Sequence, residues 1–159
     1  MRVTMELRNA ERALEKITRL ERAVRNEARR FVARGAQMLY ETARTYTALT
    51  DHTLAQLAEL GHPYARRFAP GTLHPDYLVH IQSGTLQAGL HRIGLIETDR
   101  EIIDGVANST WYDPYVQLGT VLMRARPYMA QTRADLEPVI REMAHHLLPD
   151  AVQIAVSGP

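Results

Sequence analysis

The chain has 159 residues, of which 45% are hydrophobic, and a formal net charge of +1 at pH 7. This length and composition suit one domain with a core of its own, and no apolar run is as long as a membrane span. The N-terminal residues contain no apolar signal-peptide core, and the chain contains no cysteine. We therefore expect no signal peptide, no disulfide and no thiolate metal site, as in a soluble protein made in a reducing compartment.

Charge is unevenly distributed along the chain. Residues 1–46 contain eleven basic and six acidic side chains, whereas the remaining residues contain eight basic and twelve acidic ones. A protomer with two regions of opposite sign can stack head to tail or face two different partners. The simpler alternative is an arginine-rich helix face exposed to solvent.

The first predicted element is a long helix from about Thr4 to Tyr46, a stretch without proline and with one glycine, Gly35. Its apolar residues follow a three-and-four spacing, which predicts an amphipathic helix that is either continuous or hinged near Gly35. This apolar stripe consists of Leu7, Ala10, Leu14, Ile17, Val24, Ala28, Phe31 and Met38. A continuous helix would be about 60 Å long, which exceeds the width of a compact domain of this size. We therefore expect residues 1–46 to be an oligomerisation or docking element, unless the helix bends onto its own core.

Residues 50–60 predict a short second helix with Thr50 as its N-cap. Residues 62–76 predict a loop, because they contain three prolines and a glycine. A loop of this length inside a small domain is usually functional or disordered. Its central residues form a candidate docking loop: Arg66, Arg67 and Phe68.

Residues 77–111 predict a small antiparallel β-sheet. The alternation within residues 77–82 is typical of a strand, and two further β-rich segments, 91–98 and 101–109, flank Asp99-Arg100. Two such segments around a short polar turn predict a hairpin.

A short helix is predicted next, with Asp113 as its N-cap and Pro114 in its first turn. Tyr115, Leu118 and Leu122 are spaced three and four residues apart, as on one face of a helix.

A turn then joins this short helix to the final one. Gly119 can supply the positive φ that ends a helix, and Thr120 can hydrogen-bond locally to hold the exit. Pro127 forces Arg126 into an extended conformation, and the small Ala125 indicates that another segment approaches closely. We expect the Arg126 guanidinium either to bridge a carboxylate of a neighbouring subunit or to cap backbone carbonyls of its own chain.

The last predicted helix runs from Pro127 to Leu148, with a kink at Pro138. Its apolar side consists of Met129, Leu136, Ile140, Met143 and Leu147. Residues 151–156 have the length and β-branching of an edge strand. Together these elements predict a single α+β domain spanning residues 1–159.

Metal binding is not favoured by the histidine positions. His74, Asp76 and His80 are one candidate ligand group, and the adjacent pair His145-His146 is another. Neighbouring residues on a helix point about 100° apart, and the sequence contains no HExxH pairing. We expect no bound metal.

Catalysis is not favoured either. Asp51-His52 and His62 suggest acid–base chemistry, but no serine or cysteine nucleophile motif accompanies them. We expect neither an enzyme nor a cofactor.

Direct binding of nucleic acid is an alternative for the long helix, which contains many arginines. They are Arg8, Arg12, Arg19, Arg22, Arg25, Arg29, Arg30 and Arg34. Phosphate binding requires cations gathered on one face. Here glutamates are interleaved at spacings that allow pairs within the helix, which favours a solvated or inter-subunit face.

The segment from Tyr115 to Tyr128 resembles the signature of the tail-component, or tail-completion, family of long-tailed bacteriophages. Members have an aromatic-Val-acid-aromatic-Gly-Thr block followed by Met-x-Ala-x-Pro-aromatic. The matching residues are Tyr115, Val116, Gly119, Thr120, Met123, Ala125, Pro127 and Tyr128. A second block, small-Gly-x-Leu before a strand, corresponds to Ser83-Gly84-Thr85-Leu86. The resemblance covers residues 80–148, with Gln117 in place of an acid, Leu118 in place of an aromatic residue and a longer connection at 47–82.

The resemblance implies a structural virion protein at the head–tail junction: an α+β subunit that closes into a ring, of six copies by family precedent, and caps the tail tube. Its partners would be further copies of itself, the tail tube protein and a neck or connector protein, with DNA only passing through the conduit. The alternative within this class is a neck connector or stopper. The implied assembly residues are Ser83, Gly84, Leu86, Tyr115, Gly119, Thr120, Met123, Ala125, Arg126 and Pro127.

Overall fold

The computed structural model describes residues 2–49, 77–79, 81 and 83–157. Its elements are α1 (Arg2–Tyr46), α3 (Thr85–Gly89), β1 (Leu90–Arg92), β2 (Ile96–Glu97), β3 (Ile102–Ile103), β4 (Val106–Asn108), α4 (Asp113–Leu118) and α5 (Tyr128–Ser157). The fold is α+β, as the sequence predicts. The helix predicted at residues 50–60 and the candidate docking loop with Arg66, Arg67 and Phe68 lie outside the described residues. Within the described ranges, no helix has both the length and the apolar character needed to cross a membrane.

Helix α1 is continuous over 45 residues, so the hinge considered at Gly35 does not form. Gly35 is buried, and a Cβ at this position would lie 3.9 Å from Cδ1 of Ile140 in α5. A glycine inside a helix costs only about 1 kcal/mol relative to alanine. Packing against α5 on both sides of Gly35 is sufficient to keep the helix intact.

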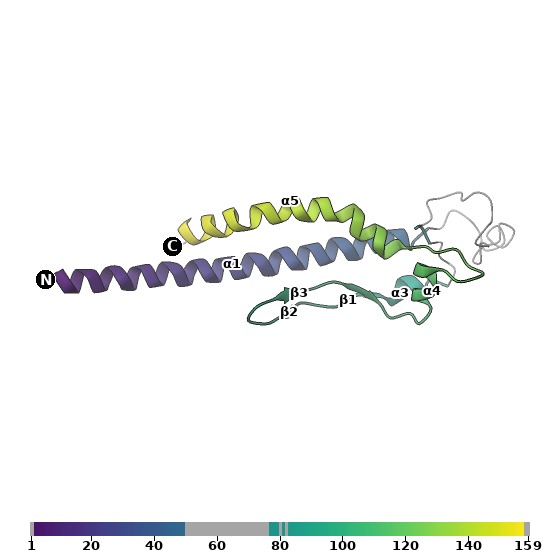
Figure 1. Cartoon of the computed structure of the whole chain (residues 1–159), viewed down its shortest axis with the longest axis horizontal. Coiled ribbons are helices and arrows are strands. Elements are labelled where there is room, and N and C mark those ends of the chain that lie inside the picture. The colour runs from purple at the N-terminus through teal and green to yellow at the C-terminus, as the bar shows by residue number, and fades with distance from the viewer. Residues whose placement is uncertain (1, 50–76, 80, 82, 158–159) are drawn as a thin grey trace.

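Helix α5 runs antiparallel along α1 (Figure 1). Leu136, Ile140, Met143 and Leu147 are partly buried, and they form the apolar side that the sequence predicts. At the start of this contact, the Tyr46 hydroxyl donates a hydrogen bond to Asp135. This bond, together with burial, raises the pKa of Tyr46 to about 12.

The edge strand predicted at residues 151–156 is wrong, because α5 continues through this segment to Ser157. Ala151 is fully buried and Ala155 is partly buried, whereas Val152 and Val156 are exposed. Burial at positions four residues apart follows the helical period, so contact with α1 overrides the β-branched composition. It also overrides Pro138 and Pro149, which both lie inside the helix.

The predicted hairpin around Asp99-Arg100 is confirmed. Strand β1 pairs antiparallel with β4, with Leu90 opposite Asn108, and β2 pairs antiparallel with β3, with Ile96 opposite Ile103. In Figure 1 the hairpin and α5 lie on different sides of α1.

The strand predicted at residues 77–82 is not present in the described part of that segment. Instead, Val79 and Ile81 hydrogen-bond to the end of α1 and the residues after it. The Val79 amide donates to the Tyr46 carbonyl at 2.8 Å, and the Ile81 amide donates to the Leu49 carbonyl at 2.9 Å. These contacts satisfy backbone groups that a sheet would otherwise pair.

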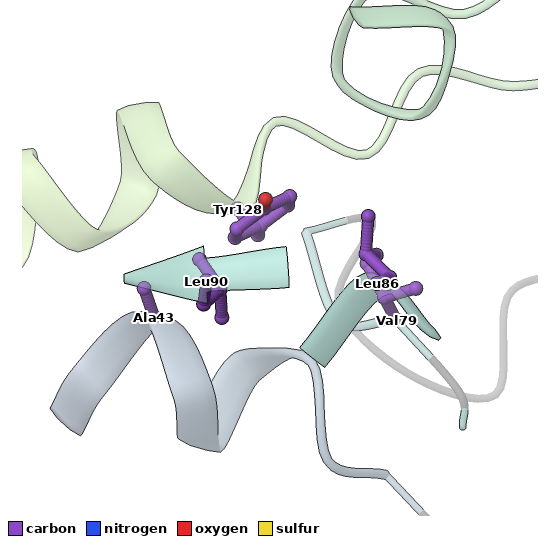
Figure 2. Packing of buried hydrophobic residues seen from close by; sticks show 5 residues of the cluster. All are labelled: Ala43, Val79, Leu86, Leu90 and Tyr128. Atoms are coloured by element: carbon purple, nitrogen blue, oxygen red, sulfur yellow. The ribbon is translucent and has the colours of Figure 1, made fainter. Parts of the chain in front are cut away.

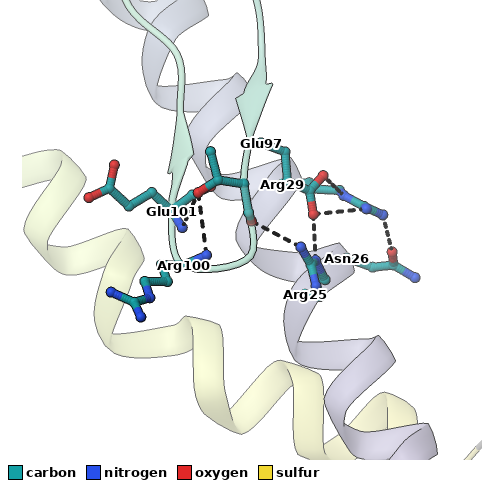
Figure 3. A network of polar contacts seen from close by, with 7 residues as sticks. Arg25, Asn26, Arg29, Glu97, Arg100 and Glu101 are labelled. Carbon is teal, nitrogen blue, oxygen red and sulfur yellow. Dashed lines mark hydrogen bonds and ion pairs between the residues drawn. The ribbon is translucent and has the colours of Figure 1, made fainter.

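Glu97 attaches the hairpin tip to α1 (Figure 3). Its Oε1 accepts a hydrogen bond from Nε of Arg25 at 2.5 Å, and its Oε2 accepts one from Nε of Arg29 at 2.6 Å. The hydrogen bonds from Arg29 and Arg25 hold the pKa of Glu97 below its usual value. Two arginines one helical turn apart therefore bind one carboxylate that is far away in the sequence.

Replacing Glu97 with glutamine is expected to speed amide hydrogen exchange at residues 96–103 with little change in the overall melting temperature, because the pairs are at the surface. The pKa of Glu97 is lower in the folded state than in the unfolded chain. The attachment therefore stabilises the folded hairpin above about pH 4.5, and this stabilisation is lost as the pH falls through the lowered pKa. Exchange rates of the two proteins should therefore converge in acid. Glu101→Gln, at the other side of the same turn, is the matched control. Equal protection in wild type and Glu97→Gln at neutral pH would contradict this role.

The described core lies at one end of the molecule, where the last turns of α1 meet α3, β1 and the start of α5 (Figure 2). It consists of Ala43, Val79, Leu86, Leu90 and Tyr128. The residues implied by the family resemblance lie at this same end, so the core supports the candidate site directly.

Candidate assembly site

The two sequence blocks singled out by the resemblance meet around one cavity of about 520 Å³. Its walls come from Thr47, just after α1, from Val79, Ile81 and residues 83–87, and from side chains between residues 111 and 126. The implied assembly residues in its lining are Ser83, Gly84, Leu86, Tyr115, Thr120, Met123 and Arg126. Segments almost thirty residues apart in sequence thus form one surface.

The first block forms a tight entry into α3. Gly84 has φ 76° and ψ −4°, a left-handed conformation that favours glycine, and it precedes the first residue of α3. The Ser83 and Thr85 hydroxyls lie 2.8 Å apart in hydrogen-bonding contact. Leu86 then points into the core, and the chain continues through α3 into β1. The predicted strand therefore follows the block only after one helical turn.

A buried polar network lies behind the cavity and is centred on Tyr128. The Tyr128 hydroxyl donates to Oδ1 of Asp113 at 2.7 Å and accepts from Nδ2 of Asn108 at 2.9 Å. Asn108 also donates to the Leu86 carbonyl, and Gln117 donates to Oδ2 of Asp113 at 2.6 Å. Burial, followed by the hydrogen bond to Asp113, raises the pKa of Tyr128. The network connects β4, α4 and α5 to the first block.

This network corrects the role predicted for Asp113. The N-cap of α4 is Tyr112, without a side-chain capping bond, and Asp113 is a buried hydrogen-bond acceptor. Gln117, which stands where the family has an acid, acts here as a donor to that carboxylate. Two acids at these positions would repel each other. Asn108 was not predicted from the sequence, because its partners are distant along the chain.

The Gly119 turn has the geometry that the sequence predicts. Gly119 has φ 73° and ψ 179°, and a Cβ there would lie 2.7 Å from the Ala125 amide nitrogen and 2.8 Å from the Met123 carbonyl oxygen. The Thr120 hydroxyl accepts from the Leu122 and Met123 amides at 3.2 and 3.0 Å. The backbone of Ala125 packs on Gly119, which explains the glycine, whereas the close approach expected at the Ala125 side chain stays a prediction.

Arg126 binds within its own chain. Its Nη1 donates to the Leu78 carbonyl at 3.2 Å, and its backbone amide donates to the Val116 carbonyl at 2.7 Å. The Arg126 guanidinium therefore caps a backbone carbonyl of its own chain, which is one of the two roles expected for it. Pro127 directly precedes α5, and its carbonyl accepts from the Gln131 amide.

Exposed apolar side chains form a rim at the cavity. Trp111, Tyr115 and Leu122 line the cavity and are 81%, 53% and 75% exposed. Leu118 and Val121 belong to the same stretch of chain and are 81% and 83% exposed. The predicted helix is present, but it ends at Leu118, so Leu122 lies beyond it, and this face is turned to solvent rather than to the core. Exposed apolar side chains this close together are typical of an interaction surface.

Of the candidate metal and acid–base groups, only the pair His145-His146 lies within the described residues. His145 and His146 are exposed on α5, and no group of three potential metal ligands occurs among the described residues. The remaining candidates all lie outside the described residues: His74, Asp76, His80, Asp51, His52 and His62. Of the arginine series, Arg25 and Arg29 bind Glu97, and Arg30 binds Glu27 at 2.6 Å.

Comparisons with protein-family models, with curated proteins and with solved structures each found no match. Function is therefore inferred from the geometry of the site and from the motif residues.

Proposed function

We propose that this chain is a structural virion protein of a tailed phage or prophage, acting at the head–tail junction as a tail-completion or tail-terminator ring subunit. The observation that supports this proposal is the convergence of both motif blocks on one cavity with an exposed apolar rim. The proposed partners are further copies in a ring, six by family precedent, together with the tail tube protein and a neck protein. DNA only passes through the conduit.

The chemistry of the cavity favours binding of an apolar partner surface over catalysis. Among its described lining residues, Arg126 has the only charged side chain, and its guanidinium binds the Leu78 carbonyl. The same lining contains no acid or histidine to act as a general base. Behind it, the Tyr128 network and the Gly119 turn fix the shape of the walls. A rigid apolar recess with an aromatic rim is suited to receive a side chain of a partner subunit.

Removing the rim is expected to abolish assembly without unfolding the subunit. The double variant Leu118→Ser/Leu122→Ser should keep its melting temperature within about 2 °C of wild type, because both side chains are already exposed. Electron microscopy and light scattering of the purified protein, alone and with the tail tube protein of the same genome, should give rings for wild type and none for the variant.

The matched control is Val139→Ser, which removes a half-exposed apolar side chain from α5, away from the rim. It should form rings as wild type does. Rings that persist in the rim variant would contradict a role for the rim, and wild-type protein that forms no ring even with the tube protein would contradict the proposed function.

A further inference from the structure

The N-terminal part of α1 extends beyond the rest of the described molecule (Figure 1). Residues 9–22 are all exposed, in contrast to residues 23–47, which are largely covered by α5 and the hairpin. Gly35 lies opposite Ile140 and the two helices are antiparallel, so counting along both places Ser157, the end of α5, beside about residue 18. About one third of α1 therefore has no covering helix in its own subunit.

The apolar stripe that α5 covers continues onto this free part. Gly35 faces Ile140 of α5, and the helical period puts Val24 and Ala28 on the same side of α1. The same three-and-four spacing extends to Leu14 and Ile17. These two side chains are 63% and 60% exposed. Most of the stability of an amphipathic helix comes from packing of its apolar face. We therefore expect the uncovered stripe to bind a partner helix.

The charges on this segment indicate which partner fits. Residues 9–22 contain four basic and three acidic side chains, a nearly balanced mixture. By the helical period, Arg12, Lys16 and Arg19 lie on the side away from the stripe. A nucleic acid would bind that cationic side, whereas the stripe, whose one charged position is Glu21, is compatible with a copy of itself. The stripe on α1 is also already built to receive an antiparallel helix, because α5 packs on it in that direction.

We propose that α1 of a second copy packs antiparallel on the stripe formed by Ala10, Leu14 and Ile17, beyond the end of α5. Glu21 selects the orientation, because it occupies a stripe position. A parallel pair would place Glu21 directly against its counterpart, whereas an antiparallel pair moves the two carboxylates to opposite ends of the contact. The second copy's N-terminus then meets the end of α5, where Val156 is 80% exposed.

The stripe is tested by Leu14→Gln/Ile17→Gln, which keeps good helix formers at both positions. Light scattering over a concentration series should give a dissociation constant for the pair at least about 100-fold higher than in wild type, because four apolar side chains are lost per dimer. Arg12→Gln/Glu15→Gln, on the opposite face, should pair as wild type does. A wild-type protein that is monomeric throughout the series, or an unchanged mass in the stripe variant, would overturn the proposal.

The orientation is tested by single cysteines, since the chain has none of its own. Ala10→Cys, near the middle of the free segment and on the stripe, should be cross-linked into dimers by a short bismaleimide. Glu21→Cys should not be, because the two thiols of an antiparallel pair are at least about 15 Å apart along the helix axis. Efficient cross-linking at Glu21 would indicate a parallel pair and overturn the antiparallel assignment. Both tests leave the rim residues unchanged. A negative result in either test would therefore contradict the helix pair without contradicting the proposed ring.

Discussion

Replacing Gly119 with alanine is expected to lower the free energy of unfolding by about 3 kcal/mol and the melting temperature by about 6–12 °C. Two costs combine at this position. The backbone is at φ 73° and ψ 179°, a region almost restricted to glycine, and the new Cβ would lie 2.7 Å from the Ala125 amide nitrogen. The Met123 carbonyl oxygen would lie 2.8 Å from the same Cβ. Since both of these atoms belong to the backbone, they cannot move aside as a flexible side chain would. Denaturant unfolding followed by circular dichroism measures the loss.

Gly94→Ala is the matched control. Gly94 has φ 89°, but a Cβ there would have no atom within 4 Å, so only the conformational cost of about 1–2 kcal/mol applies. The difference between the two variants measures the contact between Gly119 and the 123–125 segment. Equal losses in both variants would contradict the close approach as the reason for glycine at Gly119.

Elements with local signals were predicted well from the sequence. The hairpin is such a case, because Asp99-Arg100 separates two β-rich segments and the observed pairing follows directly. The spacing of apolar residues predicts the long helix. It does not predict that the helix is continuous through Gly35, because this continuity depends on contact with α5.

Elements decided by tertiary contacts were predicted poorly. Residues 151–156 have β-branched side chains, yet the burial of Ala151 against α1 keeps them helical. Val79 and Ile81 alternate as in a strand, yet their amides donate to the carbonyls of Tyr46, at the end of α1, and of Leu49, just after it. In both cases a neighbour more than thirty residues away determines the backbone conformation.

The candidate site divides in the same way. The conformations of Gly119 and Thr120 could be predicted, because each depends on atoms within six residues. The convergence of Ser83 and Leu86 with Met123 and Arg126 on one cavity could not be calculated from spacing, and the resemblance only placed them in one family pattern. The buried acceptor role of Asp113 was missed, because an aspartate before a proline is equally typical of an N-cap.

Tyr128→Ala is expected to cost about 3–5 kcal/mol, the range for removing an aromatic ring from a core. Tyr128 is completely buried in contact with the core cluster, and its loss would also leave the Asp113 carboxylate without its hydroxyl donor. Tyr115→Ala, a half-exposed tyrosine at the cavity rim, should change stability far less. A loss at Tyr128 no larger than at Tyr115 would contradict its place in the core.

Tyr128→Phe separates the polar network from the packing of the ring. It keeps the ring and removes only the hydroxyl, so we expect a loss of about 1–3 kcal/mol at neutral pH. Its effect should shrink in alkali. Because the folded-state pKa of Tyr128 is raised above the ordinary value of 10.0, the unfolded chain ionises first, and the hydroxyl's contribution is lost as the pH rises from about 10 toward the folded pKa. Unfolding measured from pH 8 to 11 should therefore give a less steep alkaline decline for Tyr128→Phe than for wild type. Parallel declines in the two proteins would show that neither burial nor the hydrogen bond to Asp113 holds the hydroxyl protonated.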